Sequence, residues 1–455
     1  MKRQPAPHRP PVALTIAGSD SGGGAGIQAD LKAMEAQGAF GTSVVTAVTA
    51  QNTFGVEGSH VLPAEQVRAQ LEAVTTDLAV DAAKTGMLAT REIVEAVSEF
   101  AAEFDRPLVV DPVMVAASGD RLLDREAEAA YEDLLDGATL ATPNADEAEV
   151  LTGKAVENPE TAAEAGREIV EMGADAALVK GGHFGEKAVV DTLVTADRVE
   201  RFTHPRIDTD ATHGSGCTLA STITARLAAG DALPEAVEAG IAFMDRAVRY
   251  HADVGEGPGA VHHLSELRNR VARAETARTV EDLVERFVYL DVSPLIPEVG
   301  MNVAGATPFA EAEAEIAAVE GRIQRTRTGV SPNRGVRFGA SGHMARFLLG
   351  AREFEPDLRF ACNCRFDENV EAALGDLGWP VAETDREAQP EGVAAEEGST
   401  MEWAAHQAFA GGDSPVGIFD RGAHGKEPML RLVAPDAETL GDRVEALIGA
   451  LEGSA

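Results

Sequence analysis

The stretch Asp208-Thr209-Asp210-Ala211-Thr212-His213-Gly214-Ser215-Gly216-Cys217-Thr218 indicates how this chain folds and where it binds a ligand. Two glycines flank a serine, and an amphipathic helix is predicted to follow directly, over residues 219–227. Glycine lets a backbone approach a ligand closely, and the first turn of a helix presents unpaired N–H groups and a partial positive charge. We therefore expect an anion-binding turn here, formed by Thr212, Gly214, Ser215 and Gly216. Cys217 would lie at the helix N-terminus, a position that lowers a thiol pKa.

A second glycine-rich turn, at residues 17–30, lies near the start of the chain. It follows the apolar run 12–16, which is typical of a buried strand, and it precedes a predicted helix. Strand, glycine turn and helix also begin a dinucleotide-binding fold, but residues 22–26 lack the Gly-x-Gly-x-x-Gly spacing of that fold. The pattern favours a small-molecule pocket, with Asp30 facing the ligand.

The chain is strongly acidic. Its formal net charge is −36, with 75 acidic residues spread along the sequence, and only seven of its 39 basic residues are lysines. Nucleic acids and anionic membranes need clustered positive charge, so we expect neither as a partner. The composition is typical of a solvated acidic surface, as in proteins of a high-salt cytoplasm, where salt screens the self-repulsion.

Cysteine usage and hydropathy predict a cytoplasmic protein. The three cysteines give no disulfide framework, and Cys362 and Cys364, two residues apart, are interpreted as small core residues. Residues 1–11 hold no apolar segment, so we expect neither a signal peptide nor an anchor. The sequence has no run of eighteen apolar residues.

The order of predicted elements indicates two domains. Short β-rich runs (43–48, 108–110, 140–141, 177–180, 188–194) alternate with helical patterns (65–76, 91–103, 160–172, 235–250). This alternation predicts an α/β fold with a mostly parallel sheet and helices on both faces. The Gly/Pro-rich stretch 253–260 ends the first unit, and a charged helical segment follows. We predict a first domain at 1–264, a linker at 265–278, and a second, smaller α/β domain at 279–455.

The motifs of the first domain occur in one order over roughly 250 residues. They stand at residues 14–20, 23–32, 46–53, 84–88, 110–114, 142–144 with Glu147, 180–183 and 212–218. On these motifs, residues 12–264 resemble the hydroxymethylpyrimidine/phosphomethylpyrimidine kinases of the ribokinase superfamily, which act in thiamine biosynthesis. The resemblance implies ATP and Mg²⁺ as cofactors.

The resemblance also implies roles for particular residues. It places Gln51 on the hydroxymethylpyrimidine, where its amide can both donate and accept, with Gly18, Asp30, Met87 and Val113 lining the pocket. It makes Cys217 the candidate base. Asn144 and Glu147 would organise the magnesium–phosphate network with help from Asp111, although an Asn-x-x-Glu pair is equally a helix cap. Lys180, after an apolar strand, should reach the ATP phosphates. His183 is interpreted as a loop histidine.

The second domain resembles ThiN-type thiamine-phosphate synthase. The resemblance rests on residues 336–346, 363–366, 397–403 and 419–429. Such a domain must expel pyrophosphate, and a leaving group of that charge is stabilised by guanidinium, ammonium and helix N-termini. The candidates are Arg322 and His343 as catalytic residues, with Arg337, Lys426, Asn363 and Asp420 as substrate-binding residues.

Three interpretations stay open. The first is a bifunctional enzyme that makes the pyrimidine diphosphate and then couples it with thiazole phosphate to give thiamine phosphate. In the second, the C-terminal domain only senses thiamine phosphate, although the helix-turn-helix that accompanies ThiN-like domains in regulators is not recognisable in the sequence. The third, a pyridoxal- or sugar-type kinase with an unrelated tail, is disfavoured by Gln51, Met87 and Cys217. We expect small-molecule substrates as partners, and a homo-oligomer.

Overall fold

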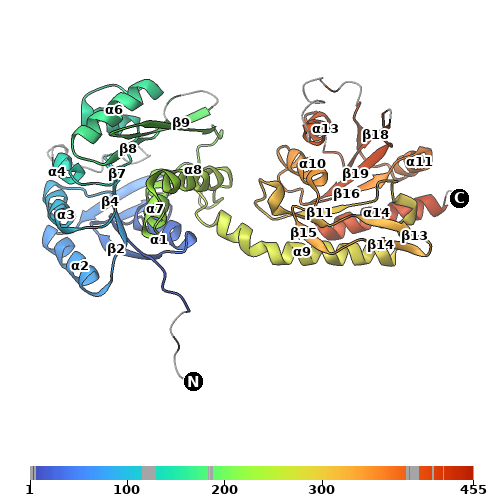
Figure 1. Cartoon of the computed structure of the whole chain (residues 1–455), viewed down its shortest axis with the longest axis horizontal. Helices are drawn as coiled ribbons and strands as arrows, with labels where there is room; N and C mark the ends of the chain where they lie inside the picture. The colour runs from blue at the N-terminus through green and yellow to red at the C-terminus, as the bar shows by residue number, and fades with distance from the viewer. Residues whose placement is uncertain are drawn as a thin grey trace. The chain divides into compact units, whose positions relative to one another are not determined.

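The computed structural model describes residues 4, 7–114, 130–182, 184, 188–385, 389, 399–411, 414–423 and 425–453. The chain divides into two compact units, Met1–Glu266 and Leu267–Ala455 (Figure 1). The predicted linker at 265–278 forms the first part of helix α9 (Ser265–Tyr289). Among the described residues, no helix combines the length and the apolar character that crossing a membrane requires.

The first unit contains an eight-stranded sheet. Strand β9 pairs antiparallel with both of its neighbours, and the other pairings are parallel. The mostly parallel sheet predicted from the sequence is therefore confirmed. The strands, in spatial order, are β10 (Val199–Pro205), β9 (Ala188–Thr195), β8 (Ala176–Val179), β7 (Leu140–Ala141), β6 (Leu108–Val110), β5 (Ala82–Thr85), β1 (Val12–Ala17) and β2 (Phe40–Val45).

Helices cover both faces of this sheet (Figure 1). One face carries α2 (Ala64–Asp77), α3 (Arg91–Glu103), α4 (Tyr131–Leu135), α5 (Ala145–Thr152) and α6 (Pro159–Glu171). The other carries α1 (Gly26–Ala36), α7 (Ser215–Ala228) and α8 (Leu233–Arg249). The central strands between them are mostly apolar and buried, as in β1, where all six residues are buried, because both faces exclude water.

The single strand predicted at 43–48 is wrong, because the chain leaves the main sheet at Thr46, directly after β2 ends at Val45. Buried Thr46 marks the break: its N–H donates to the Ala17 carbonyl and its hydroxyl to the Met87 carbonyl, at 3.0 and 2.6 Å. Strand β3 (Ala47–Asn52) then pairs with β4 (Gly55–Val61) as a separate antiparallel hairpin. This hairpin brings Gln51 to the cavity described below.

The second unit contains a seven-stranded sheet in which only β17 and β18 pair in parallel. Its spatial order is β15 (Val336–Phe338), β12 (Ile316–Val319), β11 (Val303–Ala306), β16 (Phe360–Arg365), β19 (Met429–Ala434), β18 (Gly417–Asp420) and β17 (Val381–Glu383). Between β12 and β15 in the sequence, β13 (Ile323–Thr326) and β14 (Gly329–Pro332) form a separate two-stranded hairpin.

Two layers of helices enclose the second sheet (Figure 1). One layer holds α10 (Gly342–Arg352) and α13 (Ser399–Phe409). The other holds α9, α11 (Glu368–Leu377) and α14 (Ala437–Gly453). Short 3-10 turns occur at Ser293–Leu295 and Glu313–Glu315. Cys362 and Cys364, interpreted from the sequence as core residues, are both fully buried in β16.

Candidate active sites in the two units

The first unit holds a cavity of about 660 Å³ where the two glycine-rich turns meet. It opens beside the carboxyl ends of β1, β5, β6 and β8, the edge at which parallel sheets bind ligands. Most of the residues predicted for this site line it: Gly18, Gln51, Met87, Asp111, Val113, Asn144, Glu147, Lys180, Thr212, Gly214, Ser215, Gly216 and Cys217.

The two glycine turns touch so closely that no side chain fits between them. Gly214 has φ +80°, and a Cβ there would lie 1.8 Å from the Gly24 carbonyl oxygen. Helix α7 begins at the next residue, Ser215, so the amides of its first turn have no partners within the helix. The seam between the turns therefore presents backbone N–H groups and a helix N-terminus to the cavity, a suitable site for a phosphate.

One lysine and two carboxylates meet on another wall of the cavity. The Lys180 ammonium lies 3.1 Å from Asp111 Oδ1 and 3.8 Å from Glu147 Oε2. Burial raises the pKa of the Glu147 carboxyl to about 7; the negative charge of Asp111 adds to this rise, and Lys180 opposes it. Asn144 and Glu147 form a capping box at the start of α5, so the helix-cap interpretation of this pair is correct, and both also line the cavity.

The pKa of the Cys217 thiol differs from the value expected from the sequence. Its place in the first turn of α7 predicted a lowered pKa, but burial raises the pKa of this thiol to about 11, against the lowering effects of Lys84 and the Gly26 amide. Desolvation disfavours the thiolate more than the helix terminus favours it. The thiol is therefore protonated at neutral pH before any substrate binds.

Asp30 does not face the cavity, contrary to the prediction. Its side chain is fully buried beneath the cavity floor, where its oxygens accept hydrogen bonds from Thr15 Oγ1 and Ser221 Oγ, both at 2.6 Å. Lys84, also fully buried, lies 3.1 Å from Asp30 Oδ1. Because Asp30 is enclosed by β1, β5 and α7, this polar network supports the site from below and does not line it.

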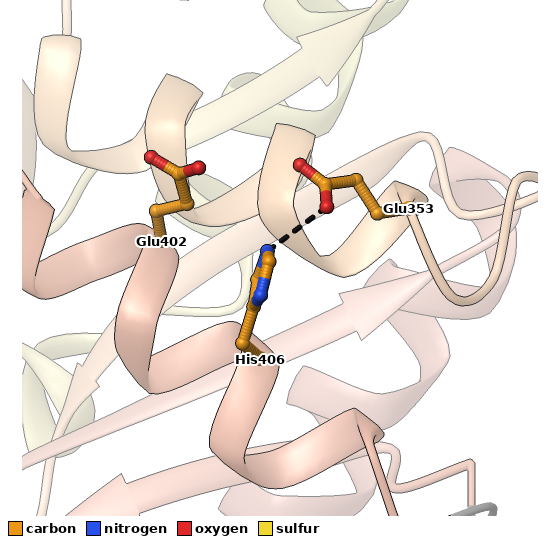
Figure 2. A group of neighbouring side chains, drawn as sticks. All are labelled: Glu353, Glu402 and His406. Atoms are coloured by element: carbon orange, nitrogen blue, oxygen red, sulfur yellow. Dashed lines mark ion pairs between the residues drawn. The ribbon is translucent and has the colours of Figure 1, made fainter. Parts of the chain in front are cut away.

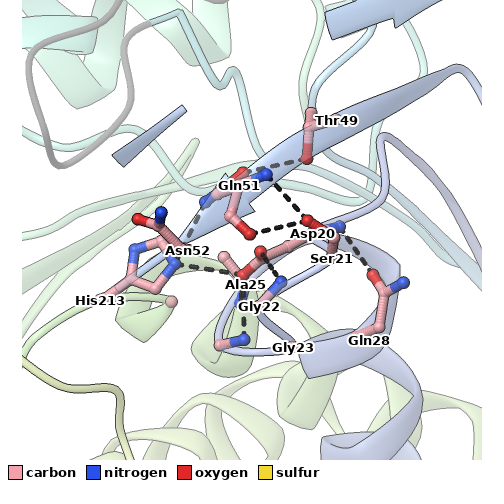
Figure 3. A network of polar contacts seen from close by, with 12 residues as sticks. Asp20, Ser21, Gly22, Gly23, Ala25, Gln28, Thr49, Gln51, Asn52 and His213 are labelled. Carbon is pink, nitrogen blue, oxygen red and sulfur yellow. Dashed lines mark hydrogen bonds and ion pairs between the residues drawn. The ribbon is translucent and has the colours of Figure 1, made fainter. Parts of the chain in front are cut away.

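Sequence reasoning missed Asp20 and His213, which join the two glycine turns (Figure 3). Asp20 accepts backbone hydrogen bonds from Gly22, Gly24 and Ala25. His213 Nε2 lies 3.2 Å from Asp20 Oδ2 and 3.2 Å from the amide end of Gln51. Asp20 stands in the glycine-rich turn at residues 17–30, so a carboxylate beside glycine amides was a signal that could have revealed it. The contact between Asp20 and His213, which are 193 residues apart, gives no signal in the sequence.

The second unit holds a cavity of about 300 Å³ at the N-termini of α10 and α13. Four of the predicted residues line it: Arg322, His343, Asn363 and Lys426. Arg322 occupies a turn with φ +69°, a conformation that a non-glycine residue adopts only under constraint. Its Nη1 donates to the Val299 carbonyl at 2.6 Å, which directs the guanidinium along the cavity wall.

His343 lies in the first turn of α10, as predicted, but the cap differs. Ser341 occupies the N-cap position, yet its side chain makes no capping hydrogen bond. Asn363 is buried and accepts the Asn302 N–H at 2.7 Å. The cavity thus combines a helix N-terminus with cationic side chains.

Two predicted residues lie away from this cavity. Arg337 on β15 pairs with Glu320 at 3.1 Å and leaves most of its side chain in water. Asp420 is buried in β18 and pairs with Arg431 of β19 at 3.1 Å. Arg431 does line the cavity, and we missed it because an arginine within an apolar strand pattern gives no local signal.

A further group of polar side chains joins α10 and α13 on the outside of the second unit (Figure 2). His406 lies 3.0 Å from Glu353, and Glu402 stands one turn before His406 on α13. The two glutamates are exposed and His406 is half-buried, and an isolated ion pair in such a place contributes little stability. We assign this group no catalytic role.

The first unit is similar in structure to small-molecule kinases. A pyridoxal kinase from Bacillus subtilis, solved as an ADP complex, superposes with a TM-score of 0.53 at 33% identity, over 57% of this chain and 99% of that one. A pyridoxal kinase from Staphylococcus aureus, solved with AMP-PCP, gives a TM-score of 0.54 at 32% identity, over 57% of this chain and 96% of that one. The sheet and its glycine-turn site are therefore those of a ribokinase-like kinase.

Sequence comparison shows which family of kinases the first unit belongs to. Residues 20–262 match the family described as phosphomethylpyrimidine kinase, and residues 279–446 match thiamine-phosphate synthase ThiN. This chain belongs to the phosphomethylpyrimidine kinase family and carries a ThiN domain behind the kinase domain. A hydroxymethylpyrimidine/phosphomethylpyrimidine kinase from Streptomyces coelicolor is 48% identical over 258 residues, 56% of this chain and 96% of that protein.

A bifunctional relative matches the same part of the chain. The thiamine biosynthesis bifunctional protein ThiED of Geobacter sulfurreducens is 46% identical over 262 residues, which are 56% of this chain and 54% of that protein. The first unit is therefore also similar to about half of a protein whose name states two functions in thiamine biosynthesis.

Proposed function

We propose that this chain carries out two consecutive steps of thiamine biosynthesis. In the first unit, ATP would phosphorylate 4-amino-5-hydroxymethyl-2-methylpyrimidine and then its phosphate, which yields the diphosphate. In the second unit, the diphosphate would couple with thiazole phosphate, releasing pyrophosphate and thiamine phosphate. The observation that carries the proposal is a pair of cavities, one in each unit, each combining a helix N-terminus with cationic side chains.

For the kinase step, the α7 N-terminus and the seam between the glycine turns would hold the transferring phosphate, and Lys180 would neutralise its charge. Gln51, Met87, Val113 and Gly18 would hold the pyrimidine. Asp111 and Glu147 present carboxylate oxygens that converge on one ammonium, so this donor set fits Mg²⁺. Mg²⁺ held there would supply positive charge that neutralises the transferring phosphate.

Cys217 would act at the hydroxyl of the substrate. Phosphoryl transfer proceeds through a loose transition state, in which the hydroxyl proton leaves late, so a small fraction of thiolate can suffice. The Cys217 sulfur lies beside the anion site, and because only its thiolate can accept the hydroxyl proton, the thiol must first release its own proton to solvent. This role makes Cys217 a candidate base whose strength depends on the bound substrate.

For the coupling step, Arg322, His343, Lys426 and Arg431 would stabilise the pyrophosphate as it leaves the pyrimidine. Asn363, fixed by its bond to the Asn302 amide, offers a polar group to the substrates from the cavity wall. The carbocation-like methylene carbon left behind would be attacked by the thiazole nitrogen. No ATP is needed here because the diphosphate already carries the activation.

The purified full chain tests both steps. With the pyrimidine alcohol, ATP and thiazole phosphate we expect thiamine phosphate, and with preformed pyrimidine diphosphate we expect the same product without ATP. Arg322→Ala and His343→Ala should slow the second reaction, whereas Arg337→Ala, outside the cavity and paired with Glu320, is the matched control. Binding of thiamine phosphate with no product at any substrate concentration would establish a sensor instead. Salt must be varied, because the acidic surface needs screening.

A further inference from the structure

The environment of His213 determines which of its ring atoms carries a proton. Nε2 lies 3.2 Å from Asp20 Oδ2, and the same carboxylate oxygen accepts the Gly24 and Ala25 amides at 2.9 and 2.7 Å. Burial alone would raise the pKa of Asp20, but the hydrogen bonds from His213 and the Ala25 and Gly22 amides outweigh it and lower the pKa. Asp20 is therefore ionised and only accepts hydrogen bonds, so the neighbouring Nε2 must carry a proton.

A protonated Nε2 constrains the Gln51 amide. The end of that amide facing His213 lies 3.2 Å from Nε2, and the other end lies 3.2 Å from Thr49 Oγ1 (Figure 3). The two ends of an amide have nearly the same shape, so the hydrogen-bond network decides which is oxygen. A protonated Nε2, whose N–H is shared with Asp20, has no lone pair that could accept an amide N–H, so the end of Gln51 facing His213 must be Oε1.

The contact with Thr49 supports the same orientation. The Thr49 hydroxyl donates to the Ser19 carbonyl at 2.7 Å, which leaves its lone pairs free to accept a hydrogen bond. With Oε1 toward His213, the Gln51 NH₂ points at this hydroxyl oxygen and donates to it. The reverse orientation would place two donors face to face at His213.

The backbone of Gln51 is held as well. Its N–H donates to Ser21 Oγ at 2.8 Å, and the Ser21 hydroxyl donates to the Gln51 carbonyl at 2.7 Å. The pairing of β3 with β4 shifts register between Ala50 and Gln51, and such a bulge redirects a side chain. Rotation of the terminal amide is thus the main freedom that remains, and His213 opposes it.

We propose that His213, oriented by Asp20, is a positioning residue that sets the substrate specificity of the Gln51 amide. The inference rests on the proposed function of Gln51 as the group that contacts the pyrimidine. In the orientation derived above, the Gln51 amide keeps one lone pair of Oε1 and one N–H of its NH₂ group for a ligand, and the two lie side by side. This edge matches an aminopyrimidine, whose exocyclic NH₂ donates and whose ring nitrogen accepts. A 4-oxo pyrimidine presents the reverse pattern and would need the amide rotated against His213.

The test compares two substrates on the full chain: the 4-amino pyrimidine alcohol and its 4-oxo analogue. The measured quantity is the ratio of kcat/KM for the two. His213→Leu removes the donor and lets the amide rotate, so we expect the ratio to fall by roughly tenfold or more, about the value of one good hydrogen bond. His213→Gln keeps an N–H near the Nε2 position and should hold the ratio within about threefold.

The controls separate this inference from the proposal beneath it. His213→Asn is polar but too short to reach Gln51, so it should behave like His213→Leu and serves if the leucine variant does not fold. An equal loss of activity toward both substrates, with an unchanged ratio, would mean that His213 is only structural and would overturn the inference. If instead Gln51→Leu leaves the pyrimidine KM unchanged, the proposed role of Gln51 itself fails.

Discussion

The buried ion pair beneath the first cavity should support the fold and not bind the ligand. Asp30 and Lys84 have no exposed side-chain surface, and Asp30 Oδ1 lies 3.1 Å from Lys84 Nζ. Burial would lower the pKa of Lys84, but the charge of Asp30 raises it, so the ammonium stays charged. Asp30→Asn would leave this charge buried without a counter-ion, which costs about 3–5 kcal/mol.

Urea unfolding measures this cost. For a slope near 3 kcal/mol per molar, the midpoint of the first unit should fall by roughly 1–2 M. Far-UV circular dichroism follows both units, whereas both tryptophans, Trp379 and Trp403, lie in the second unit. Tryptophan fluorescence should therefore keep its midpoint in the variant, which provides an internal control within the same molecule.

Two further variants sharpen the experiment. Adding Lys84→Met to Asp30→Asn removes the orphan charge and should recover most of the loss, because the amide can still bond Thr15 and Ser221. Glu95→Gln makes the same chemical change in an exposed pair with Arg91 and should cost less than about 0.5 kcal/mol. The reasoning is refuted if Asp30→Asn raises the pyrimidine KM and leaves the midpoint in place.

Three other outcomes are expected. Cys217→Ala should keep ATP affinity and reduce phosphoryl transfer by roughly a hundredfold; near-normal turnover would exclude it as the base. Gly214→Ala should abolish transfer and destabilise the first unit, because its Cβ would lie 1.8 Å from the Gly24 carbonyl, whereas Gly153→Ala, with φ +71° and open space, should cost only about 1–2 kcal/mol. Burial lowers the pKa of His263 from 6.5 to about 4, so the unfolded state binds more protons between these values. The free energy of unfolding should therefore decrease as the pH falls from 6.5 toward 4. This decrease should be smaller in His263→Met, which melting curves recorded at several pH values would show.

Local patterns in the sequence predicted the elements well where one face of a helix or one apolar run decides the outcome. The helix expected at 91–103 is α3 with the same bounds, and the strands at 108–110 and 140–141 are β6 and β7. The helix cap, which the sequence left open as an alternative for the Asn144–Glu147 pair, is present because a capping box uses only neighbouring residues. The strand at 43–48 was wrong because Thr46 is held by carbonyls from β1 and from Met87, both far away in sequence.

What depends on distant contacts could not be predicted in this way. Asp30 looked like a ligand-facing acid, but Ser221, 191 residues later, and Lys84 enclose it. Arg431 lies on the apolar strand β19, where it lines the second cavity and pairs with Asp420 of the neighbouring strand β18. Both outcomes depend on which strands become neighbours, and a single sequence does not show that.

The sequence by itself determined the two-domain order, the family of the kinase domain and the position of both glycine turns, because these follow from motifs of consecutive residues. Only the tertiary structure decided the protonation of Cys217, the burial of Asp30 and the hydrogen bonds that orient Gln51. The physical reason is that desolvation and hydrogen-bond partners come from whatever packs around a group. For these three side chains the packing comes from elements up to about 190 residues away.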